Sequence, residues 1–138
     1  MEKQKQEIKE KLFSLNNNLK KMPENILEIL IDSIQGDRMI SLDFAETQEI
    51  LKANEVVYDY IDYYPDSDKI FNGLINEKYV DRSVLIVFVL KEKDIDMEKI
   101  EDYEKSLKNL LKPENLYSYG IVPKDIEKSK ILIMGTRS

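Results

Sequence analysis

The chain of 138 residues has no cysteine and no histidine. Without cysteine it can form neither a disulfide nor a thiolate nucleophile. Because cysteine and histidine are both absent, it cannot build the usual zinc site. Histidine is also the side chain best suited to proton transfer near pH 7. Because these catalytic groups are missing, we expect a protein that is not an enzyme and that has no catalytic residues, cofactor or metal.

Glycine is scarce as well. The four glycines, Gly36, Gly73, Gly120 and Gly135, stand apart from one another along the chain. Backbone N–H groups approach a phosphate closely only where glycine removes the side chain, so nucleotide-binding loops are rich in glycine. The 138 residues contain neither a Walker sequence nor a dinucleotide-binding fingerprint. They therefore do not encode a nucleotide-binding domain of these kinds.

Long apolar runs and an excess of basic charge are absent too. The longest apolar run, VLIVFVL at 84–90, is far too short to span a bilayer, and the charged stretch MEKQKQEIKEK does not resemble a signal peptide. The net charge of −6 argues against binding a phosphate backbone and permits a basic protein partner. We expect a cytoplasmic protein with a protein partner and with no membrane or nucleic-acid partner.

The spacing of apolar and turn residues predicts an α/β fold. Residues 1–37 read as an N-terminal segment of two helices, at 2–21 and after Pro23, with Gly36 as the stop of the second. Residues 38–138 read as an α/β domain. Its expected elements are, in order, strand, helix, strand, strand, helix, strand and strand, at 39–44, 46–64, 70–76, 83–91, 97–111, 116–122 and 130–136.

This order predicts an internal repeat. IFNGLINEKYVDRSVLIVFVL begins at residue 70 and aligns without a gap with LYSYGIVPKDIEKSKILIMGT, which begins at residue 116, so the shift is 46 residues. Two overlapping β-α-β-β units, at about 39–90 and 84–136, would share the strand between them. We therefore expect a two-layer sandwich with a mixed sheet of five strands, preceded by two helices.

The run ANEVVYDYIDYYPDSDKIFNGLINEKYVDRSVLIVFVL, residues 53–90, resembles the C-terminal domain of the FtsZ/tubulin family. The matching features are Asn54-Glu55 in a helix, Pro65-Asp66 in a turn, and Ile70 and Gly73 in a strand. RMISLDF resembles the preceding strand, although the Gly-Gly pair that follows it in the family is missing. The resemblance implies the accessory half of the fold, without its GTPase domain.

A second likeness competes with the first. SLDFAET, residues 41–47, resembles the loop by which an FtsZ subunit supplies acids to the nucleotide of its neighbour. This likeness implies acidic roles for Asp43 and Glu46. The two likenesses use the same residues for different structural positions, so both cannot hold. The strand interpretation of 39–44 agrees with the repeat and is the one we favour from the sequence.

The acidic, tyrosine-rich stretch YDYIDYYPDSD, residues 58–68, supplies the candidate site. Helical spacing would place Tyr60 and Tyr64 in the core and leave other side chains outside. The spacing of the acids lacks the pattern of a calcium loop, so the stretch favours a partner surface over a metal site. The candidate partner surface consists of Tyr58, Asp59, Asp62, Tyr63 and Asp66. An edge strand at 116–122 or 130–136 could also accept a strand from a partner.

These features favour a non-enzymatic protein-interaction or assembly module. The family resemblance implies a link to a prokaryotic cytoskeletal or cell-division system, with the chain itself or a filament-forming protein as partner. Two alternatives stay open. A small acidic inhibitor, such as an immunity protein or a nucleic-acid mimic, would cluster its acids on one face. A small-ligand-binding domain, or an enzyme using carboxylates and tyrosine, would gather such groups in a deep pocket.

Overall fold

The computed structural model describes residues 2–35, 39–52 and 55–137. The helical elements and strands of these residues follow in chain order: α1 (Glu2–Leu15), η1 (Asn17–Lys21), α2 (Glu24–Gln35), α3 (Phe44–Leu51), β1 (Glu55–Asp62), α4 (Lys69–Leu74), η2 (Ile75–Tyr79), β2 (Ser83–Leu90), η3 (Glu92–Asp94), α5 (Met97–Leu110), β3 (Tyr117–Pro123) and β4 (Lys130–Arg137). None of the described helices is both long enough and apolar enough to cross a membrane.

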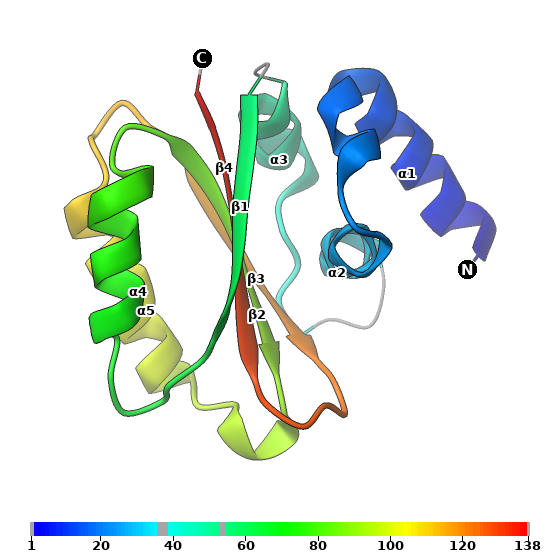
Figure 1. Cartoon of the computed structure of the whole chain (residues 1–138). Coiled ribbons are helices and arrows are strands. Elements are labelled where there is room, and N and C mark those ends of the chain that lie inside the picture. The colour runs from blue at the N-terminus through cyan, green and yellow to red at the C-terminus, as the bar shows by residue number, and fades with distance from the viewer. Residues whose placement is uncertain (1, 36–38, 53–54, 138) are drawn as a thin grey trace.

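Four strands of the described chain form one mixed sheet in the order β1-β4-β2-β3 (Figure 1). β4 runs antiparallel to both of its neighbours, and β2 runs parallel to β3. The parallel pair is joined through α5, as a parallel connection requires a crossover. β2 and β4 lie inside the sheet, while β1 and β3 form its two edges.

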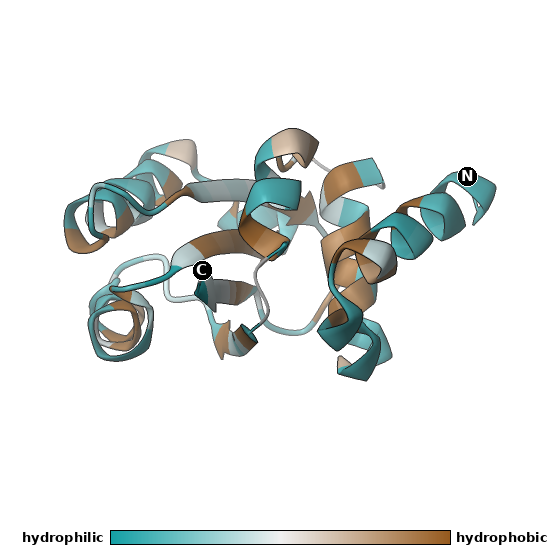
Figure 2. Cartoon of the chain, turned by 90° about the horizontal axis from the view of Figure 1, so that it is seen from above, coloured by the Kyte–Doolittle hydropathy of each residue, from teal (hydrophilic) through white to brown (hydrophobic). Residues whose placement is uncertain are grey.

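Helices cover both faces of the sheet, which lies between two helical layers (Figures 1 and 2). On one face, α1, α2 and α3 contribute to a core that includes Leu85 and Leu132. On the other face, α4, η2 and α5 contribute to a second core that includes Phe88 and Ile133. Residues 84–90 of β2 are all buried, as expected for a strand apolar on both faces.

The α/β class and the mixed sheet are confirmed. The sheet has four strands in the described residues rather than five, and helices lie on both of its faces, so the arrangement has three layers rather than two. The expected helix at 97–111 is confirmed as α5, and the Asp96 side chain caps it by accepting a hydrogen bond from the Glu98 N–H. The two strands expected near the C-terminus are confirmed as β3 and β4.

The expected helix at 46–64 is wrong. Its first part is α3, which ends at Leu51, and the remainder is the edge strand β1. In β1, Val56, Tyr58 and Tyr60 contribute to the core on the α1/α2 side, while alternate residues contribute to the other core. Because both faces are apolar, the alternation that marks a strand is hidden, and the remaining spacing imitates a helix.

The expected strands at 39–44 and 70–76 are wrong as well. In the first, only Ile40 makes a bridge, to Ile121, and Asp43 caps α3 through a hydrogen bond from the Glu46 N–H. The second is α4 and the start of η2, in which Phe71 and Ile75 are buried four residues apart. Residues 70–76 and 116–122 therefore differ in secondary structure, which contradicts the repeat at this point. The expected helix stop at Gly36 lies outside the described residues.

Two glycines permit close approaches that shape the sheet. A Cβ atom on Gly120 would lie 3.0 Å from the Ile40 carbonyl oxygen, so the small residue lets the segment before α3 approach the outer edge of β3. A Cβ atom on Gly135 would lie 2.7 Å from a ring carbon of Tyr79. Tyr79 is fully buried against β4 for this reason.

Candidate docking surface

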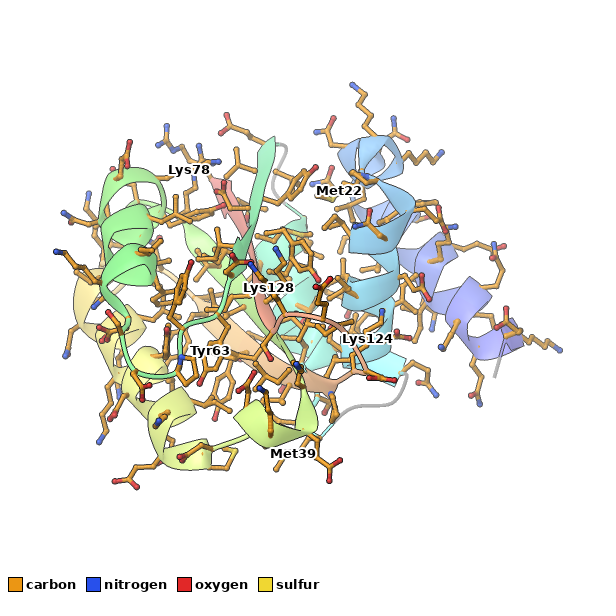
Figure 3. All side chains as sticks on the ribbon, turned by 60° about the horizontal axis from the view of Figure 1, so that its bottom comes forward. Met22, Met39, Tyr63, Lys78, Lys124 and Lys128 are labelled. Carbon is orange, nitrogen blue, oxygen red and sulfur yellow. The ribbon has the colours of Figure 1, made fainter. Side chains whose placement is uncertain are left out.

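The candidate surface expected from residues 58–68 does not form one patch. Side chains alternate along β1, so Tyr58 faces the α1/α2 side, whereas Asp59 faces η2 and Tyr63 packs into the α4/α5 side. Figure 3 shows Tyr63 and Met22 on opposite sides of the sheet. Asp66 lies in the loop beyond the strand. The structure brings only some of these residues near one another.

Each acid of the expected surface has a basic partner. Asp59 accepts a hydrogen bond from the Lys78 ammonium at 2.8 Å and another from the Tyr79 hydroxyl at 2.6 Å. The ammonium of Lys130 lies 2.6 Å from Asp62 and holds the pKa of that carboxyl below its usual value. Lys99 lies 2.7 Å from Asp66. Each of these acids belongs to a separate ion pair, so together they do not form the single acidic face that a nucleic-acid mimic would need.

Tyr63 and Tyr64 have the opposite burial to the one that a helix would give them. Tyr63 is buried, with its ring against Phe88 and Tyr103, and burial raises the pKa of Tyr63 to about 12. Tyr64, expected in the core, is exposed. The neighbouring Tyr103 hydroxyl donates a hydrogen bond of 2.6 Å to the Tyr64 carbonyl oxygen. Tyr63 is therefore a core residue of the described fold.

A different group of side chains forms an acidic surface at the β3 edge. Asp43 and Glu46 at the start of α3 line one open depression together with Tyr117 and Tyr119 of β3. The helix α5 adds Glu104, whose carboxylate accepts a hydrogen bond of 3.1 Å from the Tyr117 hydroxyl. We call this group the acidic tyrosine surface. It consists of Asp43, Glu46, Glu101, Glu104, Tyr117 and Tyr119.

The neighbouring acids affect the pKa values of the two tyrosines. Burial raises the pKa of the Tyr117 phenol, and the negative charges of Glu104 and Glu46 raise it further. Burial likewise raises the pKa of Tyr119, with an added contribution from Glu104 and Glu101. The acids come from two helices, α3 and α5, that lie on opposite faces of the sheet. They therefore meet around its edge.

The acids of this surface differ from the other acids in their partners. Eight ion pairs join lysine or arginine to acids elsewhere in the described chain, and none of them involves Asp43, Glu46, Glu101 or Glu104. Two half-buried tyrosines lie between these four charges. Among the described residues, the surface thus combines negative charge that has no ion-pair partner with aromatic area and a hydroxyl, a combination suited to a protein contact.

Parts of this surface were visible in the sequence. The alternation of LYSYG predicts that Tyr117 and Tyr119 share one face, and the likeness of SLDFAET names Asp43 and Glu46. No sequence pattern joins them to Glu101 and Glu104, because only the fold brings α5 beside β3. Among the residues that the structure describes, no group of three or more acids has the arrangement of a metal site.

Neither a family model nor a curated protein matches the chain. Among solved structures, it is similar to an empty FtsZ dimer from M. jannaschii, with a TM-score of 0.64 and 17% sequence identity over 81% of this chain and 36% of that one. It is also similar to a tryptophan-to-tyrosine mutant of FtsZ from the same organism, with a TM-score of 0.59 and 18% identity over 83% of this chain and 41% of that one.

The resemblance to the FtsZ/tubulin family is therefore confirmed as a likeness of fold. The chain spans well under half the length of these FtsZ chains, which is consistent with a fragment similar to their C-terminal domain. Several residue matches behind the resemblance are wrong: Ile70 and Gly73 lie in α4, not in a strand, and Glu55 begins a strand, not a helix turn. Asn54 lies outside the described residues.

Proposed function

We propose that the chain is a non-enzymatic docking module for a filament-forming protein of a prokaryotic cytoskeletal or cell-division system, acting in the cytoplasm. The observation that carries the proposal is the fold, which is similar to part of FtsZ but spans only 36% and 41% of the two FtsZ chains. A module that has an assembly fold without glycine-rich phosphate loops is suited to bind other subunits without turning over nucleotide.

The acidic tyrosine surface is the docking site in this proposal. Residues 41–43 have no regular structure and lead into α3, so the strand at 39–44 that excluded the SLDFAET likeness is absent and this likeness is open again. That likeness implies acids presented to a neighbouring subunit, and Asp43 is exposed at this place. Because none of the ion pairs among the described residues involves these four acids, we expect the partner to supply lysine or arginine at the contact.

The tyrosines would anchor the contact. Tyr117 and Tyr119 are half-buried, so most of each ring is already held in place and loses little conformational freedom on binding. Leu116, immediately before β3, is 42% exposed and extends the apolar area. The acids at the rim would mainly accelerate association and make binding sensitive to salt, while the rings would limit dissociation.

The test is binding of the chain to FtsZ-type proteins of its own host, measured by affinity capture and then by equilibrium titration. Asp43→Asn combined with Glu46→Gln removes two charges and keeps the shape, and asparagine still caps α3. Binding should weaken by roughly twofold to thirtyfold, since exposed ion pairs contribute about 0.2–1 kcal/mol each. The salt dependence of the association rate should also become shallower.

The matched control is Glu77→Gln combined with Glu92→Gln, which removes the same charge at two exposed positions outside the acidic tyrosine surface. This control should bind like the unmodified chain. Equal weakening by both pairs would show a general effect of net charge and would overturn the proposed docking site. Measurable GTP turnover by the purified chain would overturn its non-enzymatic role.

A further inference from the structure

The two edges of the sheet are protected to different degrees. The outer edge of β3 is partly covered, because Met39 and Ile40 donate backbone hydrogen bonds to the Ile121 carbonyl oxygen and the Ile121 N–H donates to Ile40. β3 also ends in proline, which cannot donate to a further strand. Among the residues that the structure describes, none covers the other edge strand, β1, in this way. Exposed strand edges are templates for a further strand, and natural proteins usually block them.

The backbone groups left open on β1 can be assigned from one hydrogen bond. The Tyr63 N–H donates to the Ser129 carbonyl oxygen at 2.9 Å, and these residues continue the register in which Asp62 lies opposite Lys130. Because antiparallel pairs alternate, residues 57, 59 and 61 direct their N–H and C=O groups toward β4. Val56, Tyr58, Tyr60 and Asp62 direct theirs away from the sheet, and no backbone partner of these groups occurs in the described residues.

β1 also lacks several of the usual devices that block an edge. Its sequence, EVVYDYID, contains neither lysine nor proline. Its pairing with β4 runs without interruption through eight consecutive residue pairs, so no bulge bends the strand away. Residues 56–62 are all half-exposed, and five of them are apolar or aromatic: two valines, two tyrosines and one isoleucine. A strand of this kind would gain both hydrogen bonds and buried area from a neighbour.

We propose that a second copy of the chain pairs its own β1 antiparallel with this edge, which joins two four-stranded sheets into one. The charges argue for a copy rather than for a strongly charged peptide. The three acids of the strand are neutralised within the chain, since Glu55 pairs with Arg82, Asp59 with Lys78 and Asp62 with Lys130. The edge therefore neither attracts a basic strand strongly nor repels an identical one.

The outward residues also fit a two-fold arrangement. With the symmetry axis at Tyr60, this residue faces its equivalent, and Tyr58 faces Asp62 of the second copy. All of these are outward-directed residues, so their backbone groups can pair. Asp59 would lie opposite Ile61 of the second copy, so two acids do not oppose each other directly. Aromatic side chains that meet across strands add to the stability of such a pair.

This inference does not depend on the proposed function. β1 and β3 are the opposite edges of the sheet, so self-pairing through β1 leaves the acidic tyrosine surface open. Loss of self-association need not change partner binding, and the Asp43→Asn and Glu46→Gln pair should not change self-association. The two proposals can therefore fail separately.

The test compares Tyr60→Pro with Tyr60→Ala. Both variants remove the same ring, including its contact with the Lys130 ammonium. Only proline also removes the outward N–H, and an edge strand tolerates it there because that N–H has no partner in the sheet. Molar mass is measured by sedimentation over a range of concentrations, and circular dichroism checks that each variant is folded.

We expect the unmodified chain and Tyr60→Ala to reach twice the mass of 16.3 kDa, with Tyr60→Pro remaining at the single-chain mass. Amide exchange gives a second readout that needs no variant. The amides of residues 56, 58, 60 and 62 should gain protection as the concentration rises, while those of 57, 59 and 61 stay protected throughout. A single-chain mass at every concentration, or a dimer that persists in Tyr60→Pro without protection of the outward amides, would overturn the proposal.

Discussion

Gly135→Ala should destabilise the protein, because the added methyl group has no room. Its Cβ would lie 2.7 Å and 2.8 Å from two ring carbons of Tyr79 and 3.2 Å from the Arg82 side chain. Carbon atoms in contact lie at about 3.5–4.0 Å, so the Tyr79 ring would have to move. The ring is fully buried, and its hydroxyl donates a hydrogen bond of 2.6 Å to Asp59, so movement would also strain that bond.

Overpacking of this kind typically costs about 1–3 kcal/mol. For a chain of this length the same cost corresponds to a decrease in Tm of roughly 3–10 °C. Urea unfolding monitored by circular dichroism measures the change. The control is Gly73→Ala, at a position in α4 where no atom lies within 4 Å of the added Cβ, which should be neutral or stabilise the helix by up to about 1 kcal/mol.

A double-mutant cycle decides whether the collision with Tyr79 is the cause. In a Tyr79→Leu background the ring is gone, so Gly135→Ala should cost clearly less than in the unmodified chain. An unchanged cost in that background would refute the reasoning, as would a Gly135→Ala variant that is as stable as the parent.

Three further changes test other parts of the fold. Asp96→Ala should lower the free energy of unfolding by about 1 kcal/mol through loss of the α5 cap, while Asp96→Asn should keep most of it, as measured by urea unfolding. Tyr103→Phe removes a hydroxyl whose single proton is shared between two loop carbonyl oxygens, 2.6 Å away on Tyr64 and 2.9 Å away on Ser67, and should cost about 1–3 kcal/mol in the same assay. The Asp62 pKa is lowered by Lys130, so its stabilising contribution is present above the ordinary pKa of about 3.9 and is lost as the pH falls through the lowered folded-state value. The unfolding midpoint of Asp62→Asn should therefore decline less than that of the parent in this acidic range, and parallel decline would contradict the ion pair's role.

The elements that the sequence predicted correctly carry strong local signals. α5 has a capping aspartate and a regular apolar stripe, and β2 is an apolar run too short for a typical helix. Between Glu55 and Tyr79, the sequence predicted a helix where the structure has the strand β1, and a strand where it has α4 and η2. β1 is half-covered on both faces, which removed its alternation, and α4 with η2 is a short helix whose buried positions, Phe71, Ile75 and Tyr79, lie four residues apart.

The likeness of fold was correct although several of its residue matches were not. The order of apolar segments and turns indicated the family fold correctly. The same order fits more than one assignment of helices and strands, so Ile70 and Gly73 were assigned to a strand although they lie in α4. The acidic tyrosine surface was only partly predictable for a related reason. Asp43 and Tyr117 are 74 residues apart (117 − 43), and the fold alone places them around one depression.

Co-sedimentation with filaments of an FtsZ-type protein from the same host shows whether the chain docks onto such filaments. We predict that the chain sediments with the filaments at a saturable ratio, and that Asp43→Asn combined with Glu46→Gln reduces the bound fraction while Glu77→Gln combined with Glu92→Gln does not. A chain that stays in the supernatant at every filament concentration, or that sediments equally in all variants, would contradict this prediction.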